Sequence, residues 1–586
     1  MTDKMWCRAK TVVKSIVTNK YLMLILIVAV LLRCLIITNY IGSSRETSAF
    51  NGDEVIDLNA ILQMGNNHTL NPHEFHYPSL YYYVCAIFIL PVCTFSGEWA
   101  VSLLLARSIS LFFGVLSIIA TFFVGREIYD NRTGLLAAAF LALVPVDISL
   151  SCQAKPDTMQ LFFVIMSIFY CIKIVKTQKT SNYYMACIFA GLAFTTKYIG
   201  LFLIPIVILA YFLTFETREK SFLRNTALII KKGFTNRVGV NKILFLIIAL
   251  IIPILLGTPC ILLSPLEFLL GLARSSYVSG HGTWMGRENP LSWFSGFAYG
   301  LGIVLSLLSL VGIILSLYLV RYIFKSKEVK MRTIPLAWAV FYFLLLFFTS
   351  GRTSVHYMLP VIPFLLIFAS GLFYTVNKNL KVPSLVSKKA LTAGIILIVL
   401  ISTSIFASSI VLPYTLQSNH DTRYAAAKWM ENNVPRNATI FYDVDIYIPE
   451  KYQNAVLNDY EPPVTTEIYN NTYSDYDQLV ITADWQWFYT PPLEFVNKSK
   501  PEYIFVSSGM YQRCLNNSNT PHLAEFYERL FNGSLNYTKI KEFSSIDIYQ
   551  NPYDFGIEAL IDMWNNPSAT WTGPRIIVFK RGSNEI

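Results

Sequence analysis

Long apolar runs recur along most of this chain, and they constrain its fold more than any other feature of the sequence. The hydrocarbon core of a bilayer is about 30 Å thick, so a helix needs roughly 20 predominantly apolar residues to cross it. Runs of that order follow one another from Tyr21 to about Leu412 in a chain of 586 residues. Charged residues make up only 14% of the chain and hydrophobic residues 54%, well outside the balance of soluble domains. The sequence therefore predicts an all-α polytopic membrane bundle.

The hydropathy pattern predicts about eleven transmembrane helices. One further run, SLYYYVCAIFILPVCTF from Ser79, is ambiguous, because counting it as a span moves the later basic loops to the opposite side. Lys and Arg concentrate in cytoplasmic loops, so we interpret this run as an in-plane juxtamembrane helix whose Tyr81 to Tyr83 suit the headgroup boundary. The predicted spans are 21–39, 108–125, 135–150, 158–175, 183–196, 199–214, 243–263, 297–320, 333–349, 357–376 and 390–412.

The net charge of +10 does not indicate a nucleic-acid partner. The basic residues fall in short clusters between the apolar runs, as in 4–20, 218–242 and 321–332, which is the distribution that the positive-inside rule predicts. The pattern predicts a multi-pass protein of the cell membrane with a cytoplasmic N-terminus. Nine scattered cysteines without a Cys-x-x-Cys pair indicate neither a disulfide framework nor a zinc site.

The last part of the chain has a different character. From Pro413 hydropathy falls, and β-rich stretches such as ATIFYDV and PRIIVFKR alternate with helix-like ones such as TRYAAAKWMENNV. We therefore predict a transmembrane domain over 1–412 and a soluble mixed α/β domain over 413–586 on the extracytoplasmic side. Asn-x-Ser/Thr sequons in this region fit that side of the membrane.

Carboxylates gather on the first two outer loops. The stretch NGDEVIDLNA places Asp53 and Glu54 about a dozen residues beyond the first span. An acid there can act as a general base or be a solvated loop residue; if the stretch is helical, Asp57 shares a face with Asp53. The loop CQAKPDTMQLFF contains Lys155 and Asp157, where the acid can alternatively favour the start of the next helix.

Cationic and histidine side chains occupy later positions at the same membrane face. Lys197 lies between two short apolar runs, where an ammonium must snorkel or find an anion. Arg352 and His356 lie in GRTSVHYMLPVIPFLL, and His281 lies in a Gly-rich outer loop. Arginine binds phosphate in a bidentate way. Carboxylates and cations at one face suit an anionic lipid headgroup bound beside a general base, which predicts an enzyme whose substrate is in the membrane.

Histidines in NHTLNPHEFHYPSL raise the question of a metal site. The spacing of His68, His73 and His76 fits no metal-ligand motif. We therefore expect no metal ligands and no certain cofactor, with a divalent cation as the alternative.

In this order the motifs resemble the GT-C glycosyltransferases, in particular the ArnT-like and protein O-mannosyltransferase-like families that use polyprenyl-phosphate-linked sugars. The resemblance covers about residues 20–376. Its elements are the acidic pair after the first span, HYPSLYYY, ARSISLFFG, AKPD, GLAFTTKYIGLFLIP, GTPCILLSP and an Arg-x-x-x-His-Tyr-x-x-Pro-x-x-Pro run. The sequence has no Trp-Trp-Asp-Tyr-Gly motif, which argues against oligosaccharyltransferase activity.

The resemblance implies roles for individual residues. Asp53 looks like the acceptor-activating base, with Glu54 as its rival, and Asp157 is similar to the second-loop acid of the family. A Lys commonly precedes the Pro-Pro-Leu stretch in ArnT-like enzymes, whereas Tyr77 stands there in this sequence. Contacts to the donor phosphate or sugar are then expected from Lys197, Arg352, His356, His76, Tyr77, Arg107 and His281.

The hypothesis that follows is an inverting glycosyltransferase. It would move a hexose or pentose from a dolichyl- or undecaprenyl-type phosphate to a glycan, lipid or protein acceptor on the extracytoplasmic side. The alternative is a multi-span lipid or solute transporter or flippase, which would favour charges near the bilayer midplane and an internal inverted repeat. A receptor or assembly platform would need only one anchor helix, so the multi-span bundle argues against it.

Overall fold

The computed structural model describes most of the transmembrane region and the core of the C-terminal domain. The described residues are 16–39, 52–96, 99–216, 222–235, 240–281, 292–350, 355–379, 388–416, 422–443, 446–449, 451–452, 455–458, 492–515, 521–543 and 574–582.

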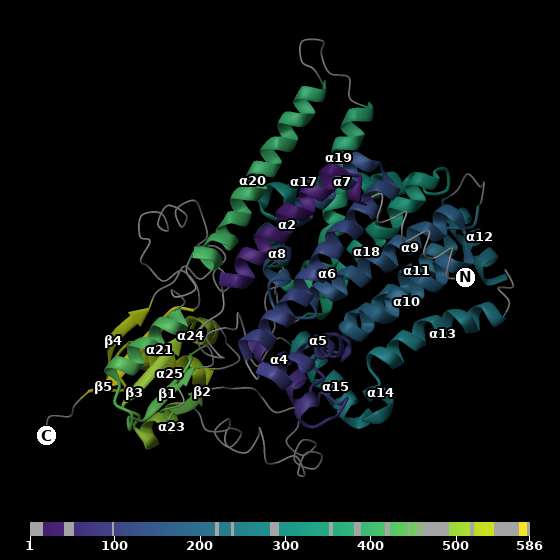
Figure 1. Cartoon of the computed structure of the whole chain (residues 1–586). Helices are drawn as coiled ribbons and strands as arrows, with labels where there is room; N and C mark the ends of the chain where they lie inside the picture. The colour runs from purple at the N-terminus through teal and green to yellow at the C-terminus, as the bar shows by residue number, and fades with distance from the viewer. Residues whose placement is uncertain are drawn as a thin grey trace.

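Long helices form the bundle (Figure 1). By length and apolar composition six described helices can cross a membrane, or seven if the bent pair α7 and α8 counts as one. The predicted all-α membrane bundle is therefore confirmed, while the number of eleven spans stays a prediction. The central helices of the bundle, of which α8 and α11 are short, are α2 (Lys20–Asn39), α6 (Trp99–Ile128), α7 (Asn131–Leu143), α8 (Pro145–Ser151), α9 (Asp157–Thr177), α10 (Thr180–Thr196), α11 (Ile204–Phe212), α13 (Val240–Gly257), α17 (Ile303–Leu319), α18 (Lys327–Thr349), α19 (Ile362–Asn379) and α20 (Lys388–Leu416).

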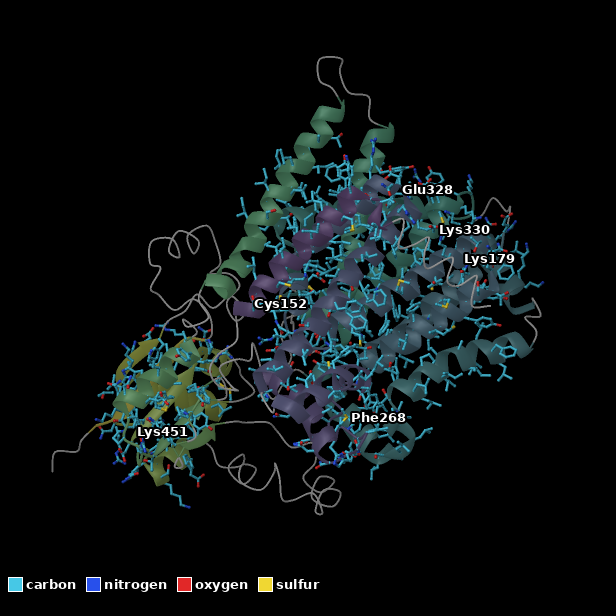
Figure 2. All side chains as sticks on the ribbon, viewed as in Figure 1. Cys152, Lys179, Phe268, Glu328, Lys330 and Lys451 are labelled. Carbon is cyan, nitrogen blue, oxygen red and sulfur yellow. The ribbon has the colours of Figure 1, made fainter. Side chains whose placement is uncertain are left out.

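The two ends of the bundle carry different elements. Helices α4 (Gly52–Asn66), α5 (Leu80–Ser96), α14 (Cys260–Leu263) and α15 (Pro265–His281) gather at one end (Figure 1). Lys179, Glu328 and Lys330 lie at the other end, far from Phe268 of α15 (Figure 2). The shorter helices α12 (Phe222–Thr235) and α16 (Ser292–Leu301) and the 3-10 helices η1 (Tyr198–Leu203), η2 (Val320–Tyr322) and η3 (Val355–Val361) complete the bundle.

The tyrosines of α5 correct one prediction. Tyr81 and Tyr82, expected at the headgroup boundary, are 0% exposed. The hydroxyl of Tyr81 lies 3.1 Å from Ser110 Oγ of α6, and that of Tyr82 donates to Asp57 Oδ1 of α4 at 2.8 Å. Because both hydroxyls find partners inside the protein, Tyr81 and Tyr82 pack against α6 and α4 and not toward lipid headgroups. Tyr83 is half-buried, and its hydroxyl donates to Leu70 O at 2.9 Å.

A bend between α7 and α8 changes the direction of the chain before the loop 152–156. Pro145 opens α8 and cannot donate to the preceding turn, so the helix breaks there, and the two axes differ by 63°. Arg33 of α2 occupies the break: its Nη2 lies 2.6 Å from Asp147 Oδ2, and its Nη1 donates to Ala142 O at 3.2 Å. The arginine thus satisfies a carbonyl at the end of α7, and α8 leads directly into the loop 152–156.

The junction between α10 and η1 is equally constrained. Lys197 caps the end of α10, and Gly200 N donates to Lys197 O at 3.0 Å. A Cβ atom on Gly200 would lie 2.3 Å from the backbone carbon of Ala193. Only glycine allows this close return of the chain, which fixes the backbone of Lys197.

We therefore expect Gly200→Ala to destabilise the protein by about 1–3 kcal/mol, as overpacking does. Thermal unfolding of the purified protein in detergent measures the effect. Gly394→Ala is the matched control, because a Cβ on Gly394 of α20 meets nothing within 4 Å and alanine is the better helix former. Equal melting temperatures for the two variants would contradict the close approach.

The C-terminal domain is a five-stranded mixed sheet with helices on both faces. The strand order is β2-β1-β3-β5-β4, with β1 parallel to β2 and β3, and β5 antiparallel to β3 and β4. Alternating strand residues divide between two cores, one under α21 and one under α23, α24 and α25. The mixed α/β class is thus confirmed, and the boundary at residue 413 stays a prediction. The elements are β1 (Ile440–Asp443), β2 (Ala455–Asn458), β3 (Tyr503–Ser507), β4 (Tyr537–Phe543), β5 (Ile576–Arg581), α21 (Thr422–Asn433), α23 (Pro492–Ser499), α24 (Ser508–Leu515) and α25 (Pro521–Phe531).

Candidate active site

Helix α4 is clamped to its neighbours by Glu54. Arg107 of α6 donates to it in a bidentate way, Nε to Oε1 at 3.0 Å and Nη2 to Oε2 at 2.9 Å. Ala154 N, in the loop 152–156, donates to the same Oε1 at 2.6 Å. Both charged side chains are 0% exposed, where a bidentate arginine offsets the desolvation of the carboxylate. The pair therefore joins α4, α6 and the loop into one rigid unit.

Asp53, next to it in the first turn of α4, faces the other way. Its Oδ2 lies 2.5 Å from Lys155 Nζ, and its side chain is 43% exposed whereas that of Lys155 is 4% exposed. The ammonium of Lys155 holds the pKa of Asp53 well below its usual range. Asp53 is therefore an ionised carboxylate that a molecule outside the bundle can reach.

Ser110 of α6 holds the loop that carries Lys155. Ser110 Oγ donates to Lys155 O at 3.0 Å, and Thr158 Oγ1 donates to Ser110 O at 2.8 Å. These bonds tie the last part of the loop and the first turn of α9 to one serine. The ammonium of Lys155 is thereby held at a fixed point between α4 and the start of α9.

A second ion pair continues from the same loop. Asp157 opens α9, and its Oδ1 lies 2.6 Å from Lys197 Nζ, with the two side chains 3% and 10% exposed. The ring of Tyr77 lies 4.7 Å from the same ammonium, in a cation–π contact. Asp157 Oδ2 is buried and has no hydrogen-bond partner within the described part of the chain. A buried carboxylate oxygen without a partner lowers stability by the cost of its lost hydration.

The two ion pairs form one series of alternating charges, which we name the charged row: Asp53, Lys155, Asp157 and Lys197. Lys155 links the pairs, because it acts electrostatically on Asp157 as well as on Asp53. Three separate stretches of chain contribute to the row, namely α4, the loop 152–156 with the start of α9, and the α10–η1 junction. Asp53 is the member most exposed to solvent, so the row can present a base at its outer end and ammonium groups behind it.

The remaining predicted residues divide into three groups. His356, in η3, is close enough to act electrostatically on Asp53 and Asp157, and His76 acts on Asp53. Arg107 pairs with Glu54, as described above. Arg352 lies outside the described residues, and His281 ends α15 without a described side chain.

Lys155 and Asp57 lie in the site but were not among the residues predicted for it. The sequence signal for Lys155 was a lysine two residues before an acid in a very short loop between apolar runs. Asp57 shared a predicted helix face with Asp53, and the structure buries it to 1% exposure beside Tyr82. Among the described residues, no group of three or more His, Cys, Asp and Glu side chains is placed to hold a metal ion, and the metal question stays a prediction.

Known proteins resemble this chain in one stretch of sequence and in the overall fold. Residues 78–234 match the family model described as dolichyl-phosphate-mannose-protein mannosyltransferase. A sequence search among curated proteins finds no match. The apo oligosaccharyltransferase of Archaeoglobus fulgidus has a TM-score of 0.52 at 14% identity, over 96% of this chain and 89% of that chain.

Two further structures are similar. The same Archaeoglobus enzyme, tethered to an acceptor peptide containing the NVT sequon, gives a TM-score of 0.51 at 13% identity, over 96% of this chain and 89% of that chain. A weaker likeness, with a TM-score of 0.48 at 12% identity over 84% of this chain and 94% of that chain, is to ArnT from Cupriavidus metallidurans bound to undecaprenyl phosphate. The predicted resemblance is confirmed in the family model over residues 78–234 and in the fold, and the chain is a multi-pass membrane protein with the fold of these glycosyltransferases.

Proposed function

We propose that this protein is a glycosyltransferase that moves a sugar from a polyprenyl-phosphate donor to an acceptor on the extracytoplasmic side, with inversion at the anomeric carbon. The observation that carries the proposal is the charged row, which sets one exposed carboxylate beside buried ammonium groups. The family model over 78–234 supports a lipid-phosphate sugar donor. The acceptor peptide bound to the Archaeoglobus enzyme supports a polypeptide among the possible acceptors.

In the proposed reaction Asp53 is the general base. The acceptor hydroxyl attacks the anomeric carbon, its proton passes to the Asp53 carboxylate, and the bond between that carbon and the phosphate oxygen breaks. The products are the glycosylated acceptor and polyprenyl phosphate, which carries one more negative charge than the donor. A positioned base of this kind contributes about 10²–10⁴-fold to a rate.

Lys155 gives this step an electrostatic advantage. Before the reaction its ammonium binds the Asp53 carboxylate at 2.5 Å. During the reaction Asp53 gains a proton and becomes neutral, while the leaving phosphate gains a negative charge. The ammonium of Lys155 can then pair with the leaving phosphate instead of the Asp53 carboxylate, so the local charge stays balanced. Charges that are preorganised in this way stabilise transition states. The low pKa of Asp53 then rises as Lys155 turns its interaction toward the phosphate.

Glu54 is the weaker candidate for the base. Both of its carboxylate oxygens accept hydrogen bonds from Arg107, and one also accepts from Ala154 N. A carboxylate bound in this way is poorly placed to accept a proton from a substrate. We assign Glu54 and Arg107 to holding α4 in place, and not to donor contact.

Lys197 is proposed to hold the donor phosphate from the other end of the charged row. We expect Lys197→Met to lower kcat/KM for the donor by about 10- to 100-fold, because a charge-assisted hydrogen bond contributes about 1.5–3 kcal/mol. Lys176→Gln is the matched control, since Lys176 pairs with Glu127 at the opposite end of the bundle. The double variant Asp157→Asn/Lys197→Met removes both charges of the ion pair. It therefore separates the loss of the donor contact from the effect of leaving the Asp157 carboxylate buried without its partner. Unchanged donor kinetics in a folded Lys197→Met protein would remove this lysine from the donor site.

The experiment that tests the function is a transfer assay with the purified full chain. A panel of radiolabelled polyprenyl-phosphate hexoses and pentoses is offered with peptide, lipid and glycan acceptors. We expect sugar transfer from at least one donor, or its slow release to water when no acceptor suits. Protein that is folded, binds the donors and neither transfers nor hydrolyses any of them would support the transporter alternative.

A further inference from the structure

A second cluster of titratable groups lies beside the charged row, and the reaction above does not use it. It consists of Glu74, His76 and Asp57. His76 Nδ1 lies 2.9 Å from Glu74 Oε1, and His76 Nε2 lies 3.3 Å from Asp57 Oδ1. Both nitrogens of one imidazole therefore face carboxylate oxygens.

This arrangement suits a charged imidazole better than a neutral one. A neutral ring has one N–H and one lone pair, whereas an imidazolium has two N–H groups. The separation of 3.3 Å from Asp57 is an ion-pair distance, and His76 Nε2 does not meet hydrogen-bond geometry there. Asp57 Oδ1 also accepts from Tyr82 OH at 2.8 Å, while its Oδ2 is buried without a hydrogen-bond partner in the described ranges.

The charged groups around His76 and Asp57 favour the protonated state of the histidine. Burial alone would lower the pKa of His76, but Asp57, Glu74 and Asp53 together raise it above its usual value. Burial raises the pKa of Asp57 to about 7, against the opposing effects of His76, Tyr82 and Lys155. Asp57 therefore changes its protonation near neutral pH, while the pKa of His76 lies above its usual value.

His76 and Asp57 lie next to residues at the two ends of the charged row, Asp53 and Lys197. Asp57 lies one helical turn after Asp53 on α4, so whatever holds Asp57 also holds the base. His76 precedes Tyr77, whose ring contacts the ammonium of Lys197. The contact between Asp57 and His76 therefore connects α4, which carries Asp53, to Tyr77, which contacts Lys197.

We propose that His76 is a positioning residue which, as an imidazolium, ties α4 to the segment 74–77 and so sets Asp53 at the right distance from Lys197. The inference rests on the proposed function for its kinetic consequence, but the charge of His76 is independent of it. Loss of the His76 proton would weaken both links to the carboxylates. Transfer is then expected to fall as the pH rises through the raised pKa of His76.

The first test measures the charge directly. The chain has seven histidines, so a ¹³C-histidine NMR titration of the full-length protein is feasible, with His76→Gln identifying the resonance. We expect His76 to titrate above the ordinary histidine value, and Asp57→Asn to lower its midpoint by about one pH unit, because a neighbouring opposite charge is lost. An ordinary midpoint that Asp57→Asn does not move would overturn the inference.

The second test measures positioning. With an active polyprenyl-phosphate donor, we expect His76→Gln to lower kcat by about 10- to 100-fold, the scale expected for a small misplacement of reacting groups. We also expect this variant to lose the decline of activity at alkaline pH. His73→Gln is the matched control, because His73 pairs with Glu267 at 2.8 Å on the same segment and should leave rate and pH profile unchanged.

The outcomes separate this inference from the proposed function. A His76→Gln protein with the wild-type rate would refute the positioning role, and so would one with a reduced rate but an unchanged pH profile. If the wild type transfers no sugar from any donor, the proposed function fails, while the NMR titration still decides the charge of His76.

Discussion

Replacing Asp53 with Asn is expected to lower the rate of sugar transfer by about 10²- to 10⁴-fold, the contribution of a positioned general base. The amide has nearly the shape of the carboxylate but cannot accept the acceptor proton. The Asp53 side chain is 43% exposed at the edge of the bundle, so its replacement should leave the fold intact. Donor affinity should remain close to that of the wild type, since Lys155 and Lys197 are still present. Single-turnover transfer, measured beside donor binding, separates these effects.

Glu54→Gln is the matched control for this prediction. The glutamine retains an oxygen to accept from Ala154 N but weakens the pairing with Arg107, so we expect lower stability and a much smaller loss of rate. A folded Glu54→Gln protein that is inactive, beside an Asp53→Asn protein that transfers sugar normally, would assign the base to Glu54.

Replacing Arg107 with Met is expected to destabilise the protein by about 3–5 kcal/mol, because it leaves an uncompensated buried carboxylate. Both partners are 0% exposed and joined by two hydrogen bonds. Unfolding of the purified protein in detergent, followed by denaturant or heat, gives the size of the loss. The result also tests the earlier expectation that Arg107 contacts the donor.

A double-mutant cycle provides the control. Glu54→Gln/Arg107→Met removes both charges while keeping an acceptor for Ala154 N, so it should be more stable than Arg107→Met alone. If Arg107→Met keeps the wild-type stability and instead raises KM for the donor, the arginine binds phosphate and the clamp on α4 is not its main role.

The transmembrane helices could be predicted from hydropathy, but their breaks could not. The predicted span 135–150 is bent at Pro145, and 297–320 is divided by Gly302, whose φ of 82° interrupts the helix between α16 and α17. Helix α6 begins at Trp99, before the predicted start at residue 108. These breaks depend on local backbone geometry and on partners such as Arg33, which window hydropathy does not register.

For the site, the sequence indicated which residue types gather there, but not how they pair. Lys155 and Asp53 are 102 residues apart, and Lys197 and Asp157 are 40 apart. Such pairs depend on how α4, α9 and α10 pack, and one sequence carries no record of that packing. The resemblance to known families suggested the roles proposed for Asp53 and Lys197, whereas the ion pair of Glu54 with Arg107 and the contacts of His76 with Glu74 and Asp57 required the structure.

The anomeric configuration of the product tests the central claim most directly. A polyprenyl-phosphate sugar of known configuration is incubated with the purified protein and an acceptor, and the new glycosidic linkage is read by NMR from its anomeric proton and carbon. One displacement assisted by Asp53 predicts the opposite configuration in every product molecule. Retained configuration would require two displacements through a covalent intermediate, and would contradict the account in which Asp53 acts only as a base.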